Sequence, residues 1–303
     1  MISMTVDIDT KQIADVQTEV QSIYASIFPH GDLEFVPRVF GWAIDCFRGK
    51  YKDYQAIDAS YHDFRHTLQV TLCMARLLRG RHFVKATPAL SQKMFELGIL
   101  AILMHDTGYL KKRKDTEGTG AKYTLIHVDR SMEFAAGMLR EKNVPISEIR
   151  SVQNMIRCTG VNVNLGAIPF QSEQERITGF ALGTGDLLGQ MAALDYIEKL
   201  PVLYSEFAEA FHYNAGKMGS EEMFSSVDDL LQKTPAFWEK YVKNKIESDF
   251  QGVYRFLNEP YPDGKNVYIE RIEENMARLR RQLEAAACAR NELDELKPAQ
   301  SSR

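Results

Sequence analysis

The chain has 303 residues, of which 45% are hydrophobic and 26% are charged, and its formal net charge at pH 7 is −4. A chain of this size can bury a large core as one domain or as two tightly joined ones. The slightly negative charge provides no global basic field. It therefore argues against a nucleic acid polymer or an acidic membrane as the main partner, but leaves a small phosphorylated ligand open.

The cysteines and the amino terminus indicate a compartment. The four cysteines are scattered and form no CxxC pair, which favours a reduced, intracellular protein. No apolar run follows a basic start, and no stretch of 18 consecutive apolar residues occurs. Because signal peptides and membrane spans need such runs, we expect a cytoplasmic protein with no membrane association.

Two amphipathic helices are predicted first along the chain. Apolar residues recur at helical spacing over residues 10–28 and again over residues 33–49, with Pro29-His30-Gly31 closing the first segment. We assign both to an N-terminal helical extension that spans residues 1–57.

The next helix carries the first candidate site residues. The stretch reads Tyr-His-Asp-Phe-Arg-His-Thr over residues 61–67, and the apolar residues that follow keep helical spacing. Asp58 or Ser60 is expected to cap the start of the helix, and Gly80 to end it. His62 and His66 are four positions apart, so on a helix both imidazoles would face the same space.

A second helix ends in a His-Asp pair. Residues 97–104 have no polar face and are therefore expected to be buried nearly all round. His105 and Asp106 follow directly. A lone carboxylate in that position would cost several kcal/mol unless a cation pairs with it. A metal ion that is also held by the imidazoles meets this requirement.

Further candidates lie downstream. Residues 110–123 are polar with two glycines, which predicts a mobile loop, and its basic run, residues 111–114, is placed to contact phosphate or to remain solvated. Helices are predicted from His127 to residue 139, from Pro145 to Cys158, and from Glu173 to residue 188. The last of these places the Asp186 carboxylate inside an apolar segment.

The remainder of the chain is also helical in pattern. Helices are expected over residues 197–212, 226–257 with an interruption at Pro235, and 267–295. No strand-type alternation occurs, so we predict an all-α fold with a core at residues 58–200 and a C-terminal helical region at residues 201–303 whose last residues are disordered. The final helix carries an apolar stripe that could support a homodimer, made of Ile269, Ile272, Met276, Leu279, Leu283 and Ala286.

The order His66, His105-Asp106 and Asp186 resembles the H…HD…D signature of the HD-domain metal-dependent phosphohydrolases. The Tyr-His-x-x-x-His opening is similar to the cyclic nucleotide phosphodiesterase branch of that superfamily. The resemblance implies a helical bundle in which His66, His105, Asp106 and Asp186 bind metal. It also implies that His62 donates a proton, and it makes His127 a possible additional ligand.

The resemblance also implies a reaction. Imidazoles and carboxylates together suit one or two divalent ions from Mg, Mn, Fe, Co, Ni or Zn. Asp106, as a catalytic residue, would bridge two ions, and a metal-bound hydroxide would attack the phosphorus of a nucleotide or another phosphate ester. Arg65 and Lys111 are weaker candidates for contacts with the substrate phosphate.

The sequence departs from the phosphodiesterase branch at two positions. Asp63 stands where an Asn is usual, and Tyr109 stands where a His is usual, which argues against a cyclic nucleotide substrate while the metal ligands stay intact.

Other interpretations stay open. An HD-type di-iron oxygenase is ranked lower because only one histidine, His127, lies between Asp106 and Asp186. A non-catalytic interaction module would use the stripe on the last helix. For His62 the alternative is a place on a helix surface without a role, and for His127 it is packing or capping alone.

Overall fold

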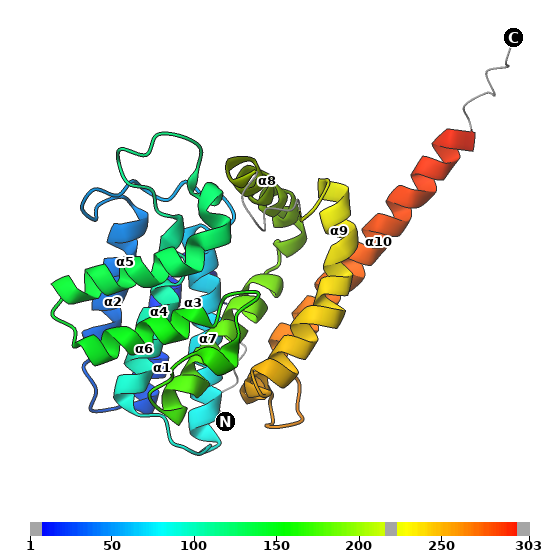
Figure 1. The fold of residues 1–303 in the computed structure, drawn as a ribbon. Helices are drawn as coiled ribbons and strands as arrows, with labels where there is room; N and C mark the ends of the chain where they lie inside the picture. Colours follow the sequence, from blue (N-terminus) through cyan, green and yellow to red (C-terminus); the bar gives the residue numbers. More distant parts are fainter. Residues whose placement is uncertain (1–7, 216–222, 296–303) are drawn as a thin grey trace, which may run out of the picture.

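The computed structural model describes residues 8–215 and 223–295 and, for side chains, extends to residue 289 (Figure 1). Among these residues every regular element is a helix, and the only β-type pairs are isolated bridges, which confirms the predicted all-α fold. No helix in these ranges has the length and apolar character needed to cross a membrane. The α-helices are α1 (Ile13–Ile27), α2 (Phe35–Phe47), α3 (Phe64–Phe83), α4 (Gln92–Met104), α5 (His127–Glu141), α6 (Ile146–Arg157), α7 (Glu173–Met191), α8 (Tyr196–Asn214), α9 (Val227–Ala236) and α10 (Val267–Glu295).

Short helices connect these elements. The 3₁₀ helices are η1 (Thr107–Tyr109), η2 (Gly120–Ile126), η3 (Leu165–Ala167) and η6 (Val253–Leu257), and the π helices are η4 (Phe237–Val242) and η5 (Lys245–Asp249). The predicted interruption near Pro235 is therefore observed, because α9 ends one residue later and continues in π form. The predicted loop at residues 110–123 is only partly irregular, since η2 begins at Gly120.

Helix α3 lies at the centre of the bundle, with α7 beside it (Figure 1). Two glycines of α7 allow this approach. A Cβ atom on Gly189 would lie 2.8 Å from the Cα atom of Val70, and one on Gly185 would lie 3.2 Å from the Val70 carbonyl oxygen. The small residues let the two backbones pack closely, which brings Asp186 against the start of α3.

Residues 97–104 of α4 are all buried, as predicted for an apolar segment without a polar face, whereas Lys93 in the first turn is exposed. The first turn is capped by Ser91, whose hydroxyl accepts a hydrogen bond from the Met94 N–H at 3.2 Å. The helix ends at Met104, so His105 and Asp106 lie at its carboxyl end, both at most 2% exposed. This places a histidine and a carboxylate in the interior of the bundle.

The start and the end of α3 differ from the prediction. Asp63, and not Asp58 or Ser60, is the N-cap, and its Oδ1 accepts a hydrogen bond from the His66 N–H at 2.8 Å. His62 therefore precedes the helix, and the premise that both histidines share one helical face was wrong. Gly80 does not end α3 either, because it lies inside the helix against the Phe256 carbonyl.

The two ends of the chain pack on the same core as the middle. Residues of α1 and α2 belong to the hydrophobic cluster that contains α3 and α4. On α10, Ile272 and Met276 are fully buried and Leu279 is 1% exposed, so the first part of the apolar stripe packs within the chain. Ala286, at the far end of the stripe, is exposed. The predicted disorder of the last residues concerns positions outside the described ranges.

Candidate metal centre

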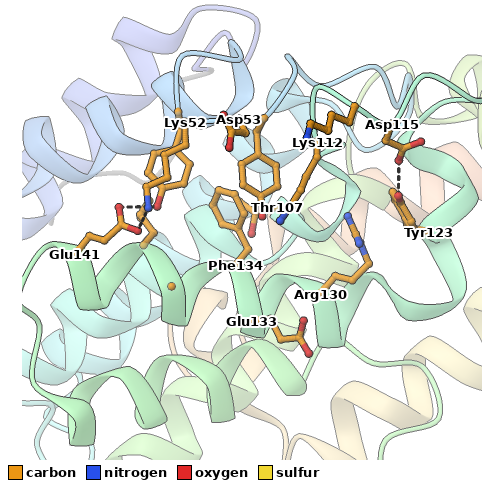
Figure 2. Close-up of a pocket in the computed structure, with 15 residues that line it drawn as sticks. Lys52, Asp53, Thr107, Lys112, Asp115, Tyr123, Arg130, Glu133, Phe134 and Glu141 are labelled. Carbon is orange, nitrogen blue, oxygen red and sulfur yellow. Dashed lines mark hydrogen bonds and ion pairs between the residues drawn. The ribbon is translucent and has the colours of Figure 1, made fainter.

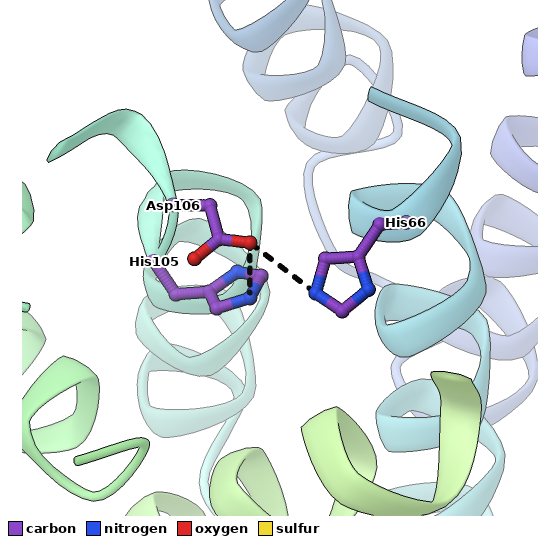
Figure 3. Close-up of side chains that lie close together, drawn as sticks. All are labelled: His66, His105 and Asp106. Atoms are coloured by element: carbon purple, nitrogen blue, oxygen red, sulfur yellow. Dashed lines mark ion pairs between the residues drawn. The ribbon is translucent and has the colours of Figure 1, made fainter. Parts of the chain in front are cut away.

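Four side chains from three helical segments meet between α3, α4 and α7. The Nε2 atom of His66 lies 3.2 Å from Asp106 Oδ2 and 3.3 Å from Asp186 Oδ1. The Nε2 atom of His105 lies 3.2 Å and 3.5 Å from the same two oxygens. Figure 3 shows His66 of α3 facing His105 and Asp106 at the end of α4. Ligand atoms of these three residues all lie within 4.8 Å of one another, so the group could hold a metal ion.

Two of the converging atoms have no hydrogen-bond partner among the described residues. His105 Nε2 and Asp106 Oδ2 are buried, and their 3.2 Å contact does not have hydrogen-bond geometry. The other ring nitrogen of His105 donates to the Ile102 carbonyl at 2.7 Å, so Nε2 is the ring atom that would offer a lone pair to an ion after losing its proton. Leaving two buried polar atoms unpaired is costly. A divalent ion between them would satisfy both, so the donor set fits a metal.

The electrostatics of the site favour positive charge. Burial lowers the pKa of His66, but the Asp106 and Asp186 carboxylates outweigh it and raise that pKa to about 9. Burial raises the pKa of Asp106, but His105 and His66 outweigh it and hold that pKa well below its usual range. The same two rings outweigh burial at Asp186 and lower its pKa, so both carboxylates are ionised at neutral pH and pair with protonated imidazoles. A divalent ion would take the place of the imidazole protons between these carboxylates.

His127 lies at the edge of this group. Its Nε2 atom is 3.9 Å from Asp106 Oδ1, which is not the oxygen that faces His66 and His105. Its Nδ1 atom donates to the Thr124 carbonyl at 2.6 Å, and burial lowers its pKa, so the neutral ring presents Nε2 to the site. The distance places His127 near the four donors but outside their immediate cluster.

The packing of η1 on α5 positions the residues after the His-Asp pair. The Gly108 N–H donates to the Ser131 hydroxyl at 2.8 Å, and a Cβ atom on Gly108 would lie only 2.0 Å from the His127 carbonyl oxygen. Tyr109 is fully buried, and its ring makes stacked contacts with His62 at 4.4 Å and with His127 at 4.8 Å, whose own ring centroids are 6.2 Å apart. Glycine at position 108 is therefore required for the close approach of η1 to α5. This approach places the Tyr109 ring against the imidazoles of His62 and His127.

His62 has a partner that sequence reasoning missed. Its Nδ1 atom lies 2.5 Å from Glu206 Oε2, and the other oxygen of Glu206 accepts the Tyr61 N–H at 2.7 Å. Burial raises the pKa of Glu206, but the attraction of His62 and the hydrogen bonds outweigh it and lower the pKa. Glu206 lies on α8, where its spacing resembles that of an exposed acidic face, so no sequence signal marked it.

The two residues that we predicted for phosphate contact already pair with carboxylates. Arg65 binds both oxygens of Asp195, at 2.6 Å and 3.1 Å. Lys111 is 4% exposed, and its Nζ atom lies 2.8 Å from Asp58 Oδ2. The positive charges of Arg65 and Lys111 are therefore balanced within the chain, and their contact with a substrate phosphate stays a prediction.

The chain was compared with protein families and with curated proteins. A family model described as Npun_R2479-like matches residues 13–278. No curated protein matches the chain.

Proposed function

This chain belongs to the Npun_R2479-like family, a name that states no reaction, and we propose its function from the candidate metal centre. The proposed activity is the hydrolysis of a phosphate ester, either a nucleotide or a phosphodiester, with the help of one or two divalent metal ions. The observation that carries this proposal is the convergence of two imidazoles and two carboxylates around buried atoms that lack hydrogen-bond partners.

The donor set defines which ions the site accepts. His66, His105, Asp106 and Asp186 would hold the ion, and their mixture of nitrogen and oxygen ligands suits Mg, Mn, Fe, Co, Ni or Zn. A divalent ion bound there supplies two effects, polarising a phosphoryl oxygen and lowering the pKa of a water molecule. Asp106 is suited to bind an ion from the middle of the donor group, because its two oxygens face different imidazoles. Oδ2 faces His66 and His105, and Oδ1 faces His127.

His62 is the residue that would deliver a proton to the leaving oxygen. Its ring centroid lies 5.5 Å from that of His66, so it borders the metal donors without belonging to them. Glu206 engages Nδ1, which leaves Nε2 as the atom that exchanges a proton with substrate. Tyr109 stacks on the ring at 4.4 Å and limits its rotation. General acid catalysis by a positioned imidazole contributes about 10² to 10⁴ in rate.

Asp63, which stands where the phosphodiesterase branch usually has an Asn, has a structural role that bears on the choice of substrate. Its side chain caps the helix that carries His66 and lies 3.4 Å from Lys199, so it is engaged within the chain. An anionic carboxylate beside the site also differs from an amide in what it can donate to a substrate. We therefore propose the phosphate ester class and not a cyclic nucleotide.

The test is a hydrolysis screen of the full chain with p-nitrophenyl phosphate and bis-p-nitrophenyl phosphate, each with Mg²⁺, Mn²⁺, Co²⁺, Ni²⁺, Fe²⁺ or Zn²⁺. We expect ion-dependent release of nitrophenol that is lost in His105→Ala while the circular dichroism spectrum stays helical. Equal rates in the wild type and in folded His105→Ala, or no turnover with any ion, would refute the proposal. Oxygen consumption under the same conditions would instead favour the di-iron alternative.

A further inference from the structure

A cavity of about 880 Å³ runs along α5 and involves none of the side chains of the candidate metal centre. We call it the α5 groove. It lies between α5, the segment after α2 and the segment after η1, and Thr107 and Phe134, at 1% and 7% exposure, are among its most buried residues. Figure 2 shows Thr107 between Phe134 and Arg130. The lining residues are Tyr51, Lys52, Asp53, Tyr54, Thr107, Lys112, Lys114, Asp115, Tyr123, Arg130, Glu133, Phe134, Gly137, Met138 and Glu141.

One end of the α5 groove is aromatic. Tyr51 and Tyr54 are stacked with centroids 6.1 Å apart, and the Phe134 ring meets both edge-on at 5.4 Å and 4.9 Å. Tyr51 and Tyr54 are only partly buried, so part of their ring surface faces the cavity. Such a surface suits a planar ring, because aromatic groups gain from offset or edge-on contacts beyond the area that they bury.

The other end presents cations whose charge is not paired. Arg130 donates from Nε to the Gly108 carbonyl at 2.7 Å and from Nη2 to the Leu110 carbonyl at 2.9 Å. Its guanidinium carbon lies 3.5 Å from the centroid of the Tyr123 ring. These contacts fix the orientation of the guanidinium, and no carboxylate in the described part of the chain forms an ion pair with it. A guanidinium held in this way is a preorganised receptor for an anion, since little ordering remains on binding.

Two lysines add to this charge, and the nearby acids are mostly engaged elsewhere. Among the described residues, Lys112 and Lys114 form no ion pair with a carboxylate, although both line the groove. The Lys112 Nζ atom lies 5.9 Å from the centroid of the Tyr54 ring, so Lys112 stands where the cationic and aromatic ends meet. Asp115 pairs with Lys122 and accepts the Tyr123 hydroxyl, and Glu141 pairs with Lys52. In Figure 2 the Glu133 side chain points away from Thr107. Asp53 and Glu133 also line the groove, so the three cations Arg130, Lys112 and Lys114 exceed the remaining carboxylates by one charge.

The α5 groove is separate from the metal donors but touches the same backbone. Thr107 follows Asp106 directly, and the two carbonyls that Arg130 binds belong to residues 108 and 110. No side chain that lines the groove is among the four donors or the His62–Glu206 pair. A ligand in the groove would thus occupy a second site and not the reaction centre.

We infer that the α5 groove binds a small phosphate monoester that carries a planar ring, with the phosphate at Arg130, Lys112 and Lys114 and the ring against Tyr54 and Phe134. The chemistry of the two ends, cationic and aromatic, matches the two parts of such a ligand, and a nucleoside monophosphate serves as the probe.

The test is calorimetric titration of the full chain with adenosine monophosphate in the presence of a chelator, which removes any contribution of the metal centre. We expect saturable binding that weakens about tenfold or more in the Lys112→Ala/Lys114→Ala double variant, since each charge-assisted contact contributes on that scale. Tyr54→Leu should weaken it about tenfold through the lost ring contact. Adenosine and inorganic phosphate should each bind more weakly than the monophosphate.

The matched control is Lys240→Ala, an exposed lysine on η4, which should leave the affinity unchanged. The inference is overturned if no saturable binding occurs, or if the double lysine variant binds as tightly as the wild type. Equal affinity for phosphate and for adenosine monophosphate would overturn the assignment of the ring. Because all titrations contain chelator, these outcomes are independent of whether the metal centre hydrolyses a phosphate ester.

Discussion

The Nδ1 atom of His62 lies 2.5 Å from Oε2 of Glu206, a residue 144 positions further along the chain. This contact joins the segment that precedes α3 to α8. It also gives His62 a fixed orientation beside the metal donors, although the residue lies outside the helix that carries His66. The site therefore contains two groups of residues: the four metal donors, which would hold an ion, and the His62–Glu206 pair, which would transfer a proton.

The first prediction concerns this pair. His62→Gln should lower the turnover of a phosphate ester by about 10²-fold while the bound metal per chain stays unchanged, because a general acid is lost and no ligand is removed. Glu206→Gln should lower turnover less and should shift the pH profile of the rate, since it positions His62 and does not contact substrate. Glu198→Gln, which breaks a surface pair with Arg278, is the control. Wild-type turnover in His62→Gln would contradict the assignment.

The second prediction concerns stability and pH. The folded-state pKa of Glu206 is lowered, so its carboxylate stabilises the fold above its unfolded-state pKa of about 4.5 and loses that effect as the pH falls through the lower folded-state pKa. The difference in unfolding free energy between the wild type and Glu206→Gln should therefore shrink between pH 6 and pH 3. Urea titrations of both proteins in chelator measure it. A difference that grows with acidity would have the wrong sign.

The third prediction concerns metal removal. An ion that binds only the folded chain stabilises it by about 2.7 kcal/mol when present at about 100 times its dissociation constant. Chelation should therefore lower the unfolding free energy of the wild type by about that amount, and the added ion should restore it. Asp106→Asn keeps the shape of the side chain but removes the charge, so its stability should respond little to either treatment. Equal responses of both proteins would argue against ion binding by Asp106.

The fourth prediction concerns the packing of α3. A Cβ atom on Gly80 would lie 1.8 Å from the Phe256 carbonyl oxygen, so Gly80→Ala should destabilise the fold by about 2 to 3 kcal/mol. Gly41, inside α2, has nothing within 4 Å of the equivalent position. Gly41→Ala should stabilise by about 0.5 to 1 kcal/mol, because alanine loses less backbone entropy on folding. Thermal unfolding of the two variants compares them directly, and similar shifts in the same direction would contradict this account.

Local patterns predicted the helices, and the resemblance predicted which donors would meet. The apolar run before His105 correctly predicted that residues 97–104 are buried, because a helical segment without a polar face has no side suited to solvent. The structure brings His66, His105, Asp106 and Asp186 together, as their order in the chain had suggested, and their role as ligands stays a prediction.

Features that depend on tertiary contacts could not be predicted. Asp63 caps α3, whereas Asp58 accepts the Gly120 N–H and pairs with Lys111, and neither contact of Asp58 is visible from local sequence. Gly80 looked like a helix end, yet its lack of a side chain serves a contact with Phe256 from a distant part of the chain. Glu206 is the clearest omission, since an acidic residue in an amphipathic helix usually faces solvent.

The most direct test of the account is the metal content of the purified full chain, measured by inductively coupled plasma mass spectrometry for the wild type and for Asp106→Asn. Circular dichroism establishes that both proteins are folded. We predict one or two divalent ions per wild-type chain and a marked loss in Asp106→Asn. Equal metal content in the two folded proteins, or no bound ion in the wild type after incubation with each candidate metal, would contradict the account.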